Sequence, residues 1–214
     1  MHRHYYSGSI KLISHHELDK QTAYHEAGHA AAIYLLNKQK QLPPIYFEIQ
    51  INKPNGNTPN QHFSAKVIDG LLLNSLPSIL MEDLANLSDS EQNSYQSAYE
   101  ADVINLLAGP LAEAKYVSIR DDEIFIQNLI NPKALHNYGG YSDVERAYNH
   151  LKTFITDSSL REKKMSELLT EAYRFVDHRA NWKRIVKLAH HILDSGQTKI
   201  TCEDVTSVFD HCFS

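Results

Sequence analysis

The most constraining feature of this 214-residue chain is the segment Ala23–Leu36, AYHEAGHAAAIYLL, which contains the pattern His-Glu-x-x-His. Its alanine and leucine content favours a helix, in which His25 and His29 lie on one face, about one turn apart. Both imidazoles can therefore reach a single metal ion, and zinc accepts such nitrogen ligands at about 2.0–2.1 Å. Glu26 lies beside this pair, where it can take a proton from a water molecule bound to the metal.

The five-residue pattern also occurs by chance in long helices, so its context matters. The flanking residues are mostly alanine, as expected for a helix inside a domain, where Glu26 and His29 would be costly without partners. Gly28 costs about 1 kcal/mol relative to alanine in a helix, which indicates that another part of the chain approaches this face closely. The alternative is a core helix whose two histidines make ordinary hydrogen bonds. The context favours metal binding.

Length and composition predict one globular domain. The chain is 42% hydrophobic and 22% charged, enough for a buried core. Its net charge of −5 argues against a nucleic-acid partner, which would require a basic surface. No apolar run is long enough to insert into a membrane, no signal peptide is recognisable, and the two cysteines fit neither a zinc knuckle nor a disulfide framework. We therefore expect a cytoplasmic protein.

The order of the predicted elements indicates a mainly α (α+β) domain. Residues 1–17 are expected to form a flexible arm, and residues 18–214 a single domain that opens with a helix ending near Asn37. Residues 45–51 and 63–69 are rich in β-branched and aromatic residues and predict strands of a small two- to three-stranded sheet. The first of these strands is a candidate for pairing with an extended substrate.

Helices are expected to dominate the rest of the chain. Apolar residues recur at helical spacing across residues 98–117, and Gly109-Pro110 predicts a kink or a division into two helices. The preceding residues 72–98 are interpreted as an insertion. Further helices are expected from Ser142 to about residue 155, at 159–177, at 180–194 and at 202–210. Ser142 is the expected cap of the first of these, with Glu145 completing a capping box.

Two histidines do not complete a catalytic zinc site, which usually has three protein ligands and one position open for water. Glu48 and His62 follow the motif, but both fall on a predicted strand or loop. Asp143 is the better candidate, because it begins a predicted helix and its carboxylate can enter a cleft from a rigid element. On residue chemistry alone, a simpler explanation is that Asp143 stabilises the positive end of its own helix.

Three blocks of sequence occur in the order of the motifs of a known family. The blocks are Tyr24–Ala30 (YHEAGHA), Leu107–Ala114 (LAGPLAEA) and Gly139–Ala147 (GGYSDVERA). They resemble the HEAGHA helix, the L-x-G-R-A-A-E helix and the G-A-x-N-D-[LI]-x-x-A-T segment of the FtsH-family peptidase domain (peptidase family M41, ATP-dependent zinc metalloproteases). The resemblance implies that Asp143 is the third zinc ligand beside His25 and His29, and that Glu26 is the catalytic base.

The sequence also departs from that family. Pro110 stands where the family has arginine, and Ser142 where it has asparagine. The family joins its peptidase domain to an AAA ATPase module and transmembrane helices, whereas no Walker motif and no membrane segment are found in this sequence. We therefore expect a domain that lacks its own ATPase, with homo-oligomerisation and a separate ATPase partner both left open.

The sequence predicts a zinc-dependent metalloendopeptidase that hydrolyses unfolded or flexible polypeptides. One alternative is a catalytically weak or inactive peptidase-like domain that binds peptide or a partner protein and keeps the metal for structure. Retention of Glu26 argues against it, because a structural metal site needs no general base. A zinc hydrolase acting on non-peptide amides is a third hypothesis.

Overall fold

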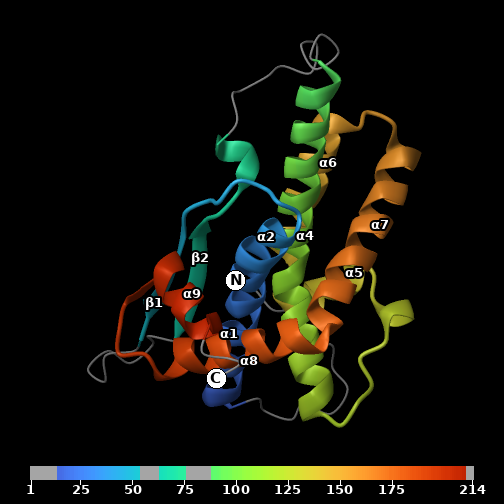
Figure 1. Ribbon diagram of the computed structural model, residues 1–214. Coiled ribbons are helices and arrows are strands. Elements are labelled where there is room, and N and C mark those ends of the chain that lie inside the picture. Colours follow the sequence, from blue (N-terminus) through green and yellow to red (C-terminus); the bar gives the residue numbers. More distant parts are fainter. Residues whose placement is uncertain (1–13, 54–62, 76–87, 211–214) are drawn as a thin grey trace.

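The computed structural model describes residues 14–53, 63–75 and 88–210 and consists mainly of helices with a small antiparallel sheet at one side (Figure 1). Helix α1 (His15–Ala31) packs against the long helix α4 (Asp89–Arg120) and against strand β2 (Ser64–Asp69), so it lies between the sheet and the other helices. This confirms the expected fold class. It also places the His-Glu-x-x-His motif in the middle of the domain.

Helix α1 begins earlier than expected. The Ser14 hydroxyl oxygen accepts a hydrogen bond from the Glu17 amide, which satisfies one of the amides that a helix start leaves without a partner. The expected arm of residues 1–17 is therefore too long, because residues 15–17 are helical; residues 1–13 lie outside the described part of the chain. Beyond α1, a π-helical turn (Ala32–Leu36) and helix α2 (Asn37–Gln39) continue the helical path.

The sheet has the strand order β2-β1-β3 and is antiparallel throughout. Strands β1 (Phe47–Asn52) and β2 (Ser64–Asp69) agree with the two predicted strands, whereas β3 (Lys199–Thr201) comes from the far end of the chain. The suggestion that the first strand pairs with a substrate is wrong, because both edges of β1 are already occupied. Within the described sheet, β2 is the edge strand that lies against α1.

Helix α4 runs without interruption through Gly109 and Pro110. A capping box between Ser88 and Glu91 begins it. All residues from Ala101 to Lys115 are buried, since α4 packs against α1, α6 and α7. This packing outweighs the local preference of proline against a helix interior, so the predicted division into two helices does not occur.

Part of the expected insertion at 72–98 has regular secondary structure, and the insertion itself stays a prediction. Residues 89–98 form the first turns of α4, and Leu72–Ser75 forms a short 3-10 helix. Both carboxylate oxygens of Asp102 accept hydrogen bonds from this short helix, one from the Leu72 amide and one from the Leu73 amide. Residues 76–87 lie outside the described ranges.

The second half of the chain contains the four predicted helices, one of them with a corrected start, and one short helix at 132–135 that was not predicted. The helices are α5 (Pro132–Leu135), α6 (Tyr141–Phe154), α7 (Ser158–Asp177), α8 (Arg179–Asp194) and α9 (Cys202–Asp210). Ser142 is not the cap of α6, because the helix starts at Tyr141 and Gly140 occupies the cap position without a side-chain hydrogen bond. Among the helices described, none has the length and apolar character needed to cross a membrane.

The close approach expected at Gly28 is confirmed. A Cβ atom at Gly28 would lie 2.6 Å from the carbonyl oxygen of Ala108 and 2.7 Å from the Cβ of Ala112, both on α4. Glycine at this position therefore lets α1 and α4 pack with almost no side chain between their backbones.

We predict that Gly28→Ala lowers the free energy of unfolding by about 1–3 kcal/mol, because overpacking outweighs the roughly 1 kcal/mol gained from alanine's helix propensity. Urea denaturation of the purified variant measures the change. Gly196→Ala is the matched control, since a Cβ there meets nothing within 4 Å. A Gly28→Ala variant as stable as wild type would contradict the close packing.

Candidate metal centre

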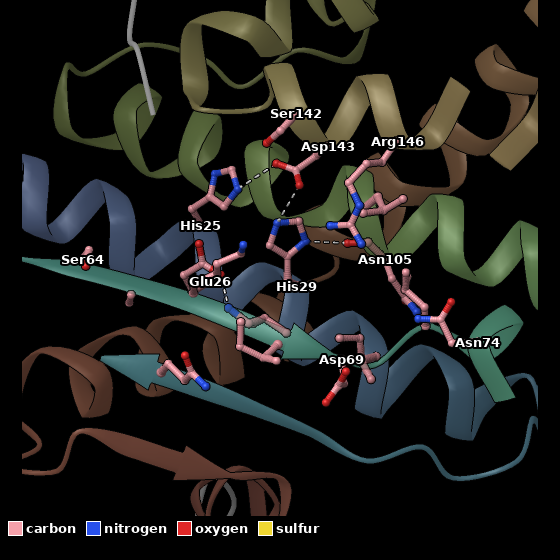
Figure 2. A pocket seen from close by; sticks show the side chains of 18 of the residues that line it. His25, Glu26, His29, Ser64, Asp69, Asn74, Asn105, Ser142, Asp143 and Arg146 are labelled. Atoms are coloured by element: carbon pink, nitrogen blue, oxygen red, sulfur yellow. Dashed lines mark hydrogen bonds and ion pairs between the residues drawn. The ribbon is translucent and has the colours of Figure 1, made fainter. Parts of the chain in front are cut away.

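Three side chains that are distant in sequence converge at one point. His25 and His29 come from α1 and Asp143 from the first turn of α6, and their ligand atoms all lie within 4.8 Å of one another (Figure 2). The Nε2 atom of His25 is 3.2 Å from Oδ2 of Asp143, and the Nε2 atom of His29 is 3.7 Å from Oδ1. Ligand atoms around a tetrahedral zinc ion are about 3.4 Å apart, given bonds of about 2.0–2.2 Å. The group can therefore hold a metal ion.

The other nitrogen of each imidazole is bound to a hydrogen-bond acceptor. Nδ1 of His25 lies 3.1 Å from Oε2 of Glu113 and 3.2 Å from the carbonyl oxygen of Tyr138, and Nδ1 of His29 lies 2.8 Å from the carbonyl oxygen of Asn105. Because each Nδ1 faces a hydrogen-bond acceptor, Nδ1 carries the hydrogen atom when the ring is neutral. Nε2 then has no hydrogen, and its lone pair points to the shared centre. Metal-binding histidines are commonly oriented in this way.

Glu113 is a further residue of the candidate centre, and the motif in the sequence does not point to it. It is 1% exposed and belongs to a helix that is buried on all sides at this level. A carboxylate in such a place needs a partner, and this was the sequence signal that could have identified it. The two backbone carbonyls that hold the histidines carry no such signal, because every residue has one.

Charge at the centre is distributed between the histidines and the aspartate. Burial lowers the pKa of His25, but its hydrogen bonds to Asp143 and Glu113 outweigh burial and place the pKa well above 6.5. Burial raises the pKa of Asp143, but the charge of His29 and the hydrogen bond from His25 bring it well below its usual range. The centre thus favours a positive charge beside a fixed carboxylate. A divalent cation can supply that charge in place of protons.

Glycines in two elements make room for this arrangement. A Cβ at Gly109 would lie 2.3 Å from Nε2 of His29, so only glycine leaves space for the ring. Gly139 adopts a left-handed conformation with φ of 71°, and a Cβ at Gly140 would lie 2.6 Å from Cβ of Pro110. The loop between α5 and α6 can therefore press against α4, which brings the first turn of α6 to the histidines.

Glu26 is buried next to the metal-binding group without belonging to it. Its Oε2 atom accepts a hydrogen bond of 2.7 Å from the Val67 amide on β2. Burial raises the pKa of Glu26, and the charges of the two histidines and the Val67 hydrogen bond offset part of this rise. A carboxylate with a raised pKa is a stronger proton acceptor, so the Glu26 carboxylate could act as a base at this position.

A cavity of about 800 Å³ opens beside the centre. Strand β2 forms one wall, and residues of α4 and α6 form the other. This volume is within the range of binding sites for small ligands or part of a peptide. His25, Glu26, His29 and Asp143 all face it, so the structure brings every predicted site residue to one accessible place.

We predict that Glu113→Gln lowers the affinity for zinc by about 10–100-fold, because it weakens the acceptor that orients His25 without removing a ligand. Competition with a chromophoric chelator measures the affinity. Glu145→Gln, an exposed change on α6, serves as the control and should leave the affinity unchanged. Equal affinities for Glu113→Gln and wild type would show that Glu113 does not orient the ligand.

No protein-family model, curated protein or solved structure matches this chain. The geometry of the centre and the three sequence blocks are therefore the features that point to a function.

Proposed function

We propose that this chain is a zinc-dependent metalloendopeptidase, related to the FtsH-family peptidases, that hydrolyses unfolded or flexible polypeptides. The observation that carries the proposal is the orientation of the two histidines. Each Nδ1 is held by an acceptor, and each Nε2 points to the carboxylate of Asp143. Two imidazole nitrogens and one carboxylate oxygen form a donor set typical of catalytic zinc.

The number of ligands supports catalysis over a purely structural role. Within the described ranges, no fourth histidine, cysteine, aspartate or glutamate joins the group of three. Structural zinc sites usually have four protein ligands, whereas catalytic sites have three and leave one position for water. The cavity beside the group provides the space that water and a substrate require.

A zinc ion held by His25, His29 and Asp143 would lower the pKa of a bound water to about 7 and would polarise a carbonyl group. In the proposed reaction, Glu26 accepts a proton from the attacking water and delivers it to the leaving amine. The Val67 amide holds the Glu26 carboxylate at Oε2 and so fixes its position relative to the wall of the cavity. His25, His29 and Asp143 would hold the metal, and Glu113 would keep His25 in the binding orientation.

The edge of β2 is the proposed docking strand for substrate. Alternate residues of a strand direct their backbone groups to the same side, so Ala65 shares the outward orientation of Val67. Both residues line the cavity. A polypeptide in extended conformation can pair with this edge, whereas a folded protein cannot, which supports an unfolded or flexible substrate. Self-assembly and a separate ATPase partner stay predictions from the family resemblance.

We predict that Glu26→Gln lowers the rate of casein cleavage by about 10²–10⁴-fold, the range typical of loss of a general base. The variant should keep about one zinc ion per chain, because Glu26 is not part of the metal-binding group. Release of labelled casein fragments and elemental analysis measure the two quantities.

The same Glu145→Gln variant controls for loss of a glutamate and should cleave at the wild-type rate. Cleavage that survives Glu26→Gln, or a wild-type protein without zinc, would overturn the proposal. A wild-type protein that holds zinc and binds peptide but does not cleave it would instead support the alternative of a peptide-binding domain.

A further inference from the structure

The cavity contains a buried polar side chain that the proposed mechanism does not use. Asn105 on α4 is only 2% exposed, and in the described part of the structure neither Nδ2 nor Oδ1 of its amide has a hydrogen-bond partner. Asn105 nevertheless lines the cavity. A buried amide without partners is costly, and a ligand in the cavity would supply the missing hydrogen bonds.

Arg146 lines the same cavity from α6. It is exposed, and it forms no hydrogen bond or ion pair with the residues that the structure describes. Its charge acts on the buried carboxylate of Asp102, but both oxygens of that carboxylate are already hydrogen-bonded to the Leu72 and Leu73 amides. The guanidinium group is therefore available to a ligand.

Both residues are adjacent to the metal centre. The backbone carbonyl of Asn105 holds His29, and Arg146 follows Asp143 by one helical turn, a rise of about 4.5 Å. Figure 2 shows Asn105 and Arg146 on the side of His29 that is turned away from His25. A ligand group bound there would lie beside the metal centre.

Arg146 is the cation that would attract an anion to this part of the cavity, whose lining also includes the carboxylate of Glu26 on α1. On the wall formed by α4 and α6, Asp143 is the only acidic lining residue, and its charge is offset at the centre. Apart from it, that wall presents the cation of Arg146 and the neutral amide of Asn105. The opposite wall carries one cation, Lys66, and one carboxylate, Asp69, both on β2.

We propose that Arg146 and Asn105 form a subsite that binds a carboxylate group of the substrate. The guanidinium group can donate two parallel hydrogen bonds to a carboxylate. The Asn105 amide can donate to the same group through Nδ2 and accept a peptide N–H through Oδ1. The carboxylate can belong to an aspartate or glutamate side chain or to the C-terminus of a peptide. That the carboxylate belongs to a substrate rests on the proposed function, whereas binding itself requires no cleavage.

Fluorescence anisotropy with two pairs of labelled hexapeptides tests the subsite on the purified full chain carrying Glu26→Gln, which prevents cleavage during the measurement. One pair differs by glutamate against glutamine and has amidated C-termini. The other pair has no acidic residue and differs by a free against an amidated C-terminus. We expect about tenfold tighter binding, or more, for the carboxylate member of at least one pair, and that pair identifies the source of the carboxylate.

Adding Arg146→Gln should reduce the affinity for the carboxylate peptide to that of its neutral partner and leave the neutral peptide unchanged. Arg146→Lys should be intermediate, because it keeps the charge but loses the paired donors, and Asn105→Ala should weaken binding of the carboxylate peptide severalfold. Lys66→Gln is the matched control, since it removes the same charge from the opposite wall. It should retain the discrimination.

The subsite would be overturned if the carboxylate and neutral peptides of both pairs bound equally or not at all. It would also be overturned if the preference for the carboxylate peptide survived Arg146→Gln, or if Lys66→Gln abolished it equally. If Arg146→Gln in the otherwise wild-type chain lowered kcat equally for acidic and neutral substrates, the arginine would stabilise the reaction intermediate instead, which also overturns the proposal. An active protease without discrimination contradicts only this subsite, whereas discrimination in a protein that never cleaves contradicts only the proposed function.

Discussion

The hydrogen bonds from the Nδ1 atoms of His25 and His29 to α4 and to the loop before α6 are the interactions on which the site depends. They reach Glu113, the Asn105 carbonyl and the Tyr138 carbonyl. The imidazoles can make them only because Gly28 and Gly109 let α1 and α4 approach closely. The close packing of α1 and α4 and the orientation of the two imidazole rings therefore depend on the same two glycines. A side chain at either glycine would displace the rings.

The close contact between α1 and α4 explains which residues of the site can be predicted from the sequence. The spacing of His25 and His29 indicates a shared face on any helix, so the motif predicts two ligands without reference to the rest of the chain. Asp143 could not be derived in this way, because nothing local to it refers to α1, and only the resemblance to a family selected it. Glu113 and Asn105 act through contacts across the α1–α4 interface, and such contacts have no period in the sequence.

The errors in the predicted fold have a related origin. Apolar spacing predicts a helix only from residue 98, because residues 89–97 are polar and acidic, although Ser88 and Glu91 form a readable capping box that begins α4 at Asp89. The start of α6 was predicted at Ser142 from its side chain, whereas the contact of Gly140 with Pro110 places the start at Tyr141. Strand β3 is only three residues long and exists through its pairing with β1, which no local pattern of three residues can predict.

The long separation of the three candidate ligands in sequence would determine when the chain can bind a metal ion. His25 and Asp143 are 118 positions apart, so an unfolded chain must close a long loop, at an entropic cost, before it can offer all three ligands. A metal ion would therefore bind the folded chain much more tightly than the unfolded one, and by linkage it would stabilise the fold as a whole. During synthesis the centre cannot form until α6 has emerged and packed on α4. The chain would thus become competent to bind the ion only after most of its tertiary structure is in place.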